Sequence, residues 1–135
     1  MASDEQRPVV VVEDDPSMRQ ALTRILRVAG YLPLTFDSGE ALIDDGSAAG
    51  AACLILDVQL PGMTGLELRS RLVRDGPAVP VIFITAYDEP EARLKASEAG
   101  AVAFLTKPFA GRDLIDAVMQ AHGKSPPARG RRWRD

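Results

Sequence analysis

The sequence has few of the features that mark secreted or membrane proteins. It contains one cysteine, Cys53, so no disulfide can form within the chain and nothing favours an oxidising compartment. The apolar run Val9–Val12 is far shorter than the roughly 20 residues of a membrane-spanning helix. The N-terminal stretch MASDEQRP also lacks the basic start of a signal peptide. These absences predict a cytoplasmic protein that does not associate with membranes.

The 135-residue chain has a formal net charge of −3, but the charges are unevenly distributed. Residues 123–135 hold five of the 16 basic side chains and one of the 19 acidic ones, which leaves 11 against 18, or −7, for residues 1–122. An acidic body repels the phosphates of nucleic acid, so we do not expect this domain to bind nucleic acid. Trp133 stands among arginines, where a solvated tail is favoured over stacking on a nucleic acid.

Short apolar runs alternate with helical patterns, which is typical of βαβ units and a parallel sheet. The predicted strands are residues 8–12, 32–36, 53–56, 79–84 and 101–106, and residues 45–50 are predicted as a loop. We therefore predict an α/β fold with five βα units in one doubly wound, five-stranded parallel sheet. Residues 8–122 would form this domain, between an extension at 1–7 and a basic, disordered tail at 123–135.

Polar side chains follow four of the five predicted strands. The first strand leads to Glu13 and Asp14, the third to Asp57, the fourth to Thr85 and the fifth to Lys107, whereas the second leads only to Asp37. In open parallel sheets, ligands bind beyond the carboxyl ends of the strands. Three carboxylates gathered there repel one another, and a hard cation such as Mg2+ offsets that repulsion. With Mg2+ and Lys107 facing it, Asp57 is a candidate nucleophile for phosphoryl transfer.

Each of these residues has an ordinary explanation when taken alone. Acidic residues after a strand commonly cap the next helix, an aspartate before a Pro-Gly loop is commonly a turn residue, and a lone lysine is commonly solvated. Their joint placement at the strand ends favours the chemical interpretation. Cys53, within a predicted strand, is expected to be a buried packing residue. His122 ends the last helix, where a cation suits the helix dipole, and is not expected to bind metal or carry phosphate.

Four segments resemble the receiver domains of two-component response regulators. They are residues 11–19 (VVEDDPSMR), residues 56–65 (LDVQLPGMTG), the pair Thr85-Ala86 and the trio Lys107-Pro108-Phe109. All four stand in the family's order and spacing, and the resemblance covers residues 8–122. It implies a flavodoxin-like (βα)5 fold, similar to the chemotaxis receiver, with strand order 2-1-3-4-5.

The resemblance also implies a role for each matching residue. Asp57 would accept a phosphoryl group from a phosphohistidine of a partner histidine kinase or histidine phosphotransfer protein. Asp14, Asp57 and the backbone carbonyl of Gln59 would bind Mg2+ directly. Glu13, where many relatives have Asp, would act through a water molecule.

Further positions would hold the phosphoryl group and report its presence. Thr85 and Lys107 would bind phosphoryl oxygens, the small Ala86 would leave room for the group, and the Lys107-Pro108 peptide would be cis. Phe104 would be the aromatic switch residue, turning inward as Thr85 moves; it lacks the hydroxyl that a tyrosine would offer. Gln59 and Tyr87 would tune self-dephosphorylation, with the bulk of Tyr87 shielding the phosphoryl group from water.

The expected function is that of a phosphorylated signalling switch, not of an enzyme beyond its own phosphoryl transfer and slow self-dephosphorylation. The downstream protein would bind the face formed by the last two helices and the last strand, with the chain a monomer or a phosphorylation-dependent dimer. Three alternatives stay open: the receiver portion of a longer DNA-binding transcriptional regulator, a phosphate sink, and a Mg2+-dependent phosphatase. The phosphatase usually has a second acid two residues after its nucleophile, where this chain has Gln59.

Overall fold

The computed structural model describes residues 7–123, and the predictions for the N-terminal extension before residue 7 and for the basic tail after residue 123, Trp133 included, lie outside that range. The strands are β1 (Val9–Val12), β2 (Pro33–Phe36), β3 (Cys53–Asp57), β4 (Val81–Thr85) and β5 (Ala103–Thr106). The helices are α1 (Pro16–Val28), α2 (Gly39–Asp45), η2 (Ser47–Gly50, a 3₁₀ turn), α3 (Gly65–Asp75), α4 (Pro90–Glu98) and α5 (Gly111–His122). All strand pairs are parallel and the order is β2-β1-β3-β4-β5, which confirms the predicted fold class and strand order.

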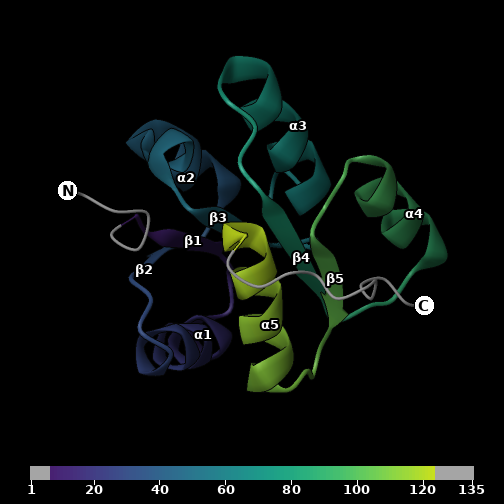
Figure 1. Ribbon diagram of the computed structural model, residues 1–135. Coiled ribbons are helices and arrows are strands. Elements are labelled where there is room, and N and C mark those ends of the chain that lie inside the picture. The colour runs from purple at the N-terminus through teal and green to yellow at the C-terminus, as the bar shows by residue number, and fades with distance from the viewer. Residues whose placement is uncertain (1–6, 124–135) are drawn as a thin grey trace.

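The sheet lies between two helical layers, with α1 and α5 on one face and α2, α3 and α4 on the other (Figure 1). Successive side chains of a strand point to opposite faces, so each strand supplies both cores. Val9 and Val11 pack toward α1 and α5, whereas Val10 and Val12 pack toward α2, α3 and α4. Strands β1, β3 and β4 are buried along their whole length, as continuous apolar runs predict.

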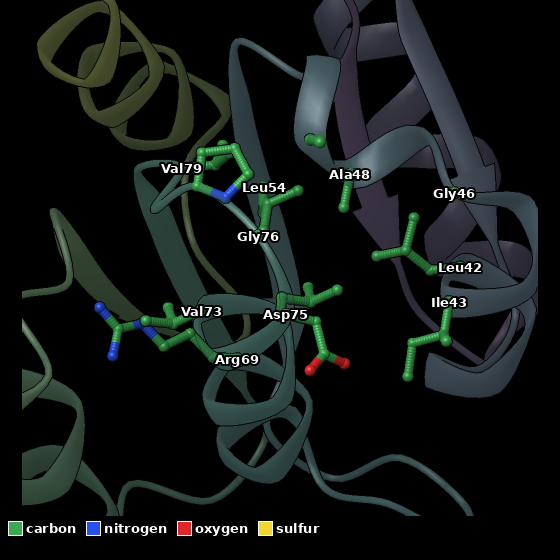
Figure 2. A pocket seen from close by; sticks show the side chains of 13 residues that line it. Leu42, Ile43, Gly46, Ala48, Leu54, Arg69, Val73, Asp75, Gly76 and Val79 are labelled. Atoms are coloured by element: carbon green, nitrogen blue, oxygen red, sulfur yellow. The ribbon is translucent and has the colours of Figure 1, made fainter.

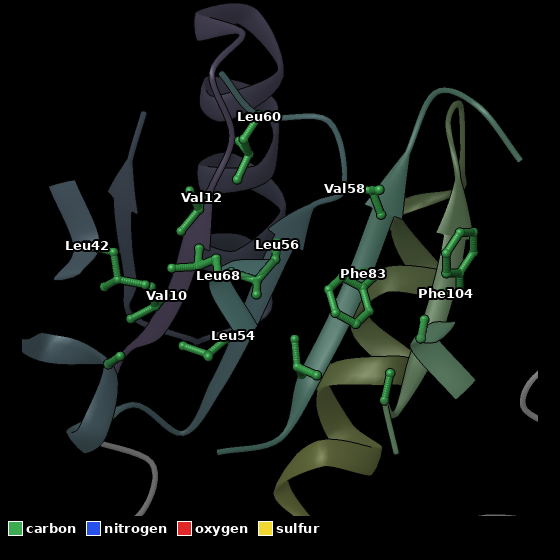
Figure 3. Packing of buried hydrophobic residues seen from close by; sticks show 14 of the residues in the cluster. Val10, Val12, Leu42, Leu54, Leu56, Val58, Leu60, Leu68, Phe83 and Phe104 are labelled. Carbon is green, nitrogen blue, oxygen red and sulfur yellow. The ribbon is translucent and has the colours of Figure 1, made fainter. Parts of the chain in front are cut away.

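The core beneath α2, α3 and α4 contains Phe83 of β4, the largest fully buried side chain (Figure 3). Leu68 of α3 and Leu42 of α2 pack onto the sheet there and are fully buried. Phe104 of β5 closes the same core at the edge of the sheet. This packing fixes the strands, and with them the loops at their carboxyl ends.

The loops that follow β1 and β3 are tied to the helices they lead into. The side chain of Asp15 accepts a hydrogen bond from the Met18 amide and caps α1. Thr64 and Glu67 form a reciprocal capping box at the start of α3. These capped loops hold the residues after β1 and β3 at one edge of the sheet.

Three predicted segments differ from the structure by more than one residue. Residues 45–50, predicted as a loop, contain η2, whose Ala48 packs into the core. Strand β4 begins at Val81 and not at residue 79, because Pro80 has no amide hydrogen to give to the sheet. Strand β5 begins at Ala103 and not at residue 101, because the Ala101 amide bonds to the carbonyl of Ala96 and belongs to the turn after α4. No helix in residues 7–123 is long and apolar enough to span a bilayer.

Candidate functional site

Three carboxylates from two neighbouring strand ends meet at the carboxyl edge of the sheet. Glu13 and Asp14 follow β1, and Asp57 is the last residue of β3. Each offers an oxygen atom within 4.8 Å of the others. Glu13 and Asp57 are buried, whereas Asp14 is exposed, so the cluster opens to solvent on the Asp14 side. An oxygen-only ligand set that is partly open to water fits a hard divalent cation such as Mg2+.

Lys107 supplies the positive charge of this cluster. Its Nζ donates to Glu13 Oε1 at 2.9 Å and to Asp57 Oδ2 at 3.0 Å, across separations of 94 and 50 residues. The Lys107-Pro108 peptide is cis, and the Lys107 amide donates to the Thr85 carbonyl at 2.7 Å. The fifth strand end is thereby tied to the fourth, and the ammonium group points into the carboxylates.

The pKa values of Glu13 and Lys107 respond to this burial. Burial raises the pKa of Glu13 above its usual 4.5 and outweighs the hydrogen bonds from Lys107 and the Asp15 amide, which lower it. Burial alone lowers the pKa of Lys107, but its hydrogen bonds to Glu13 and Asp57, together with their negative charges, leave it raised above 10.5. Lys107 is therefore a permanent cation at neutral pH.

The β3–α3 loop folds tightly around Asp57. The amide of Gln59 donates to Asp57 Oδ1 at 2.9 Å, so both oxygens of this carboxylate are engaged. Gly65 passes so close that an added Cβ would collide with the backbone carbonyl of Asp57. Only glycine permits this approach, which brings the start of α3 against the end of β3.

Thr85, the last residue of β4, is fully buried and its hydroxyl has three neighbours. Oγ1 lies 2.7 Å from Gln59 Oε1 and 3.1 Å from the Tyr87 carbonyl, and it accepts a hydrogen bond from the Tyr87 amide. A hydroxyl has one proton to donate, so the short contact with Gln59 is the better bond. Ala86 is exposed, and Tyr87 is 61% exposed.

Phe104 lies under the guanidinium of Arg93 on the α4–β5 face. Its ring is 6% exposed, and Arg93 Cζ stands 4.8 Å from the ring centroid. Arg93 is held in turn by Asp88, which accepts two hydrogen bonds of 3.1 Å from it. Asp88 follows Tyr87 directly, so the segment that contacts the Thr85 hydroxyl also anchors the cover over Phe104.

Sequence reasoning missed two arginines. Arg93 gave no signal, because its contacts depend on the relative positions of α4 and β5. Arg19 donates to the carbonyls of Glu13 at 2.8 Å and Asp14 at 3.3 Å. The position of Arg19 in the first turn of α1, close after the acidic residues, could have indicated a contact with the loop that carries them. Cys53 is buried as predicted, and burial raises the pKa of its thiol to about 12.

A separate cavity of about 270 Å³ lies between α2 and α3 (Figure 2). Leu42, Leu54 and Val79 line its apolar part, and the guanidinium of Arg69 points away from Leu42 in this view. None of the residues of the carboxylate cluster lines it. The cavity is therefore distinct from the site at the strand ends.

The chain is similar in sequence and fold to known proteins. Residues 9–119 match the family described as response regulator receiver domain. Nodulation protein W of Bradyrhizobium diazoefficiens is 41% identical over 113 residues, which cover 84% of this chain and 50% of the relative. Response regulator protein TmoT of Ectopseudomonas mendocina is 35% identical over 124 residues, covering 92% of this chain and 56% of the relative. The chain thus spans about half the length of these curated relatives.

Solved structures give the same result. The crystal structure of a response regulator receiver protein from Burkholderia phymatum is 45% identical, with a TM-score of 0.76, and the match covers 90% of this chain and 99% of that one. The response regulator StyR is 38% identical, with a TM-score of 0.79, covering 87% of this chain and 60% of StyR.

Proposed function

Since the chain belongs to the response regulator receiver family, we propose that Asp57 is its phosphoryl acceptor and that a phosphohistidine of a partner histidine kinase or phosphotransfer protein is the donor. The observation that carries the proposal is the convergence of Glu13, Asp14, Asp57 and Lys107 at one edge of the sheet. A carboxylate nucleophile beside an ammonium group and a cation-binding cluster is suited to phosphoryl transfer.

In the transfer step, an oxygen of the Asp57 carboxylate forms a bond to phosphorus. The bond between phosphorus and the histidine nitrogen of the donor breaks, and the imidazole keeps the electron pair. Lys107 Nζ, 3.0 Å from Asp57 Oδ2, then donates to a phosphoryl oxygen and neutralises part of its charge. The Thr85 hydroxyl donates a hydrogen bond to another phosphoryl oxygen, and the small Ala86 beside it leaves the approach open.

Asp14 and Asp57 are proposed as direct ligands of Mg2+, with the carbonyl of Gln59 as a third and Glu13 acting through water. The oxygen-only donor set fits this ion. Mg2+, when bound, offsets the repulsion among the carboxylates and the phosphoryl oxygens. The side chain of Gln59 and the backbone of Tyr87 both contact the Thr85 hydroxyl, and we propose that these two residues set how readily water reaches the phosphoryl group.

The α4–β5–α5 face is the proposed output surface. Thr85 contacts Tyr87, Tyr87 adjoins Asp88, and Asp88 holds Arg93 over Phe104. A Thr85 hydroxyl that turns toward a phosphoryl oxygen gives up its contacts with Tyr87. That loss reaches Phe104 through Arg93 and alters the surface that a downstream protein binds.

Backbone NMR with Mg2+ and beryllofluoride, a phosphoryl mimic, tests the proposal. Shift changes are expected around Asp57 in the wild type, extending to α4, β5 and α5, and none in Asp57→Asn. Asp75→Asn, an exposed aspartate of α3, is the matched control and should respond like the wild type. A wild type that does not respond would refute the function, and turnover of small phosphate esters well beyond one equivalent would support a phosphatase instead.

A further inference from the structure

Arg19 reaches back from the first turn of α1 to the loop that carries two of the site's carboxylates. Its Nη1 donates to the backbone carbonyl of Glu13 at 2.8 Å and to that of Asp14 at 3.3 Å. The side chain is only partly exposed. One guanidinium nitrogen therefore bridges two consecutive carbonyl groups directly after β1.

The Asp14 carboxylate depends on this loop for its position. Lys107 engages Glu13 and Asp57 but not Asp14. Within residues 7–123, the Asp14 side chain makes no hydrogen bond or ion pair of its own, yet its oxygen lies within 4.8 Å of those of Glu13 and Asp57. Repulsion from those two carboxylates pushes it outward. The backbone of residues 13–15 therefore decides where this carboxylate lies.

Asp15 is tied to α1 by accepting hydrogen bonds from the Met18 and Arg19 amides, and two further contacts hold the residues before it. The amide of Asp15 donates to Glu13 Oε2 at 3.0 Å, on the side of the site. Arg19 holds the carbonyls of Glu13 and Asp14 on the side of α1. Hydrogen bonds from a charged donor are stronger than those between neutral groups, so the Arg19 contact is a firm restraint.

We propose that Arg19 is a positioning residue of the cation site, holding the β1–α1 loop so that Asp14 faces Asp57 and Mg2+ binding needs little rearrangement. The proposal rests on the function proposed above and adds a residue to it. The Arg19 guanidinium contacts the carbonyl groups of this loop and none of the carboxylates proposed to hold the ion.

The sign of the effect separates this role from a purely electrostatic one. A guanidinium near a divalent cation repels it, so removing the charge alone would tighten Mg2+ binding. Loss of the restraint does the opposite, because binding must then order the loop. Weaker Mg2+ binding on removal of Arg19 therefore identifies positioning.

Calorimetric titration of the full chain with MgCl2 tests the proposal. Arg19→Ala is expected to bind Mg2+ about tenfold more weakly than the wild type, the factor that corresponds to about 1.4 kcal/mol. Arg19→Lys, which keeps the charge and one donor group, should recover part of the loss. Arg24→Ala is the matched control: it removes an exposed arginine of the same helix that makes no contact with this loop, and should change the dissociation constant by less than about twofold.

Thermal unfolding without Mg2+ accompanies each titration, so that a loss of fold is recognised. If Arg19→Ala does not fold, the comparison of Arg19→Lys with the wild type tests the positioning role instead. Weaker Mg2+ binding, that is, a larger dissociation constant, is again expected. Unchanged or tighter binding in the folded variant overturns the positioning role while leaving the proposed function intact. A wild type that binds no Mg2+ refutes the proposed function itself.

Discussion

Replacing Lys107 with Met tests whether this lysine balances the charge of the resting site. Met has a similar length and no charge, so the change removes the ammonium group with little loss of packing volume. The variant leaves Glu13 and Asp57 buried at the carboxyl edge of the sheet without their shared cation. We expect the free energy of unfolding in EDTA at neutral pH to fall.

The size of the fall follows from burial. The Lys107 side chain is 17% exposed, and those of Glu13 and Asp57 are 1% and 4% exposed. Removing one partner of a buried ion pair costs about 3–5 kcal/mol, because the remaining charge loses its compensation. Because the site opens to solvent at Asp14, the lower end of that range is expected. Lys95→Met, which breaks an exposed i,i+4 pair with Glu91, is the control and should cost less than about 1 kcal/mol.

The loss should depend on pH. Burial raises the pKa of Glu13 above 4.5, and the Lys107 hydrogen bond is the largest opposing influence. Without Lys107, the pKa of Glu13 in the folded protein rises further. A carboxyl group whose pKa is higher in the folded than in the unfolded protein costs stability once the pH exceeds its unfolded pKa, here 4.5, and the full cost is reached above the folded pKa. The cost disappears as the pH falls toward 4.5. The difference from wild type should therefore shrink between about pH 7.5 and about pH 5.

Urea denaturation followed by circular dichroism measures these differences. Mg2+ should restore part of the lost stability, because it binds the folded state alone: for a site with a dissociation constant of about 1 mM, about 10 mM Mg2+ contributes about 1.4 kcal/mol. Equal stability of Lys107→Met and wild type would refute the charge-balancing role. A deficit of the same size at both pH values would show that the cost is one of packing and not of charge.

Three further substitutions or treatments test other parts of the structure. Gly65→Ala should cost about 1–3 kcal/mol in urea denaturation because its Cβ meets the Asp57 carbonyl, whereas Gly50→Ala, with open space around it, should cost little; equal effects would contradict the close approach. Cys53, whose buried thiol has its pKa raised to about 12, should react with a thiol reagent at pH 8 only after unfolding; rapid modification of the native protein would contradict its burial. Arg93→Ala should lower stability by about 0.5–1 kcal/mol and shift the NMR signals of Phe104, and unchanged signals would show that the guanidinium does not cover the ring.

The fold, and the meeting of four polar residues at one edge of the sheet, were predictable because both depend on regular features of the chain. Continuous apolar runs marked the central strands β1, β3 and β4, which are buried on both faces. Parallel strands end at one edge, so the residues after them were expected to meet, and Glu13, Asp14, Asp57 and Lys107 do meet there. The strand order and the assigned roles came from the resemblance to receiver domains, not from the spacing itself.

The side-chain contacts within the site were beyond the reach of spacing. Lys107 divides its ammonium between Glu13 and Asp57, which depends on the relative heights of three strand ends. The Thr85 hydroxyl turns to the side chain of Gln59, a residue expected to contribute its carbonyl and to tune dephosphorylation. Arg93 covers Phe104 only because α4 packs beside β5. Each of these contacts is set by a rotamer and by tertiary packing, which the local sequence does not encode.

These contacts have a consequence for the proposed switch, because the groups assigned to the phosphoryl oxygens already have partners. The Thr85 hydroxyl has one hydrogen atom, which now points to Gln59 Oε1. It can therefore donate a hydrogen bond to Gln59 or to a phosphoryl oxygen, but not to both. Exchanging one hydrogen bond for another changes the free energy little, whereas a buried group left without a partner costs more. Phosphorylation of Asp57 would therefore release the Gln59 side chain from Thr85 as it recruits the hydroxyl. The residue proposed to control water at the phosphoryl group would then become free to move only once that group is in place.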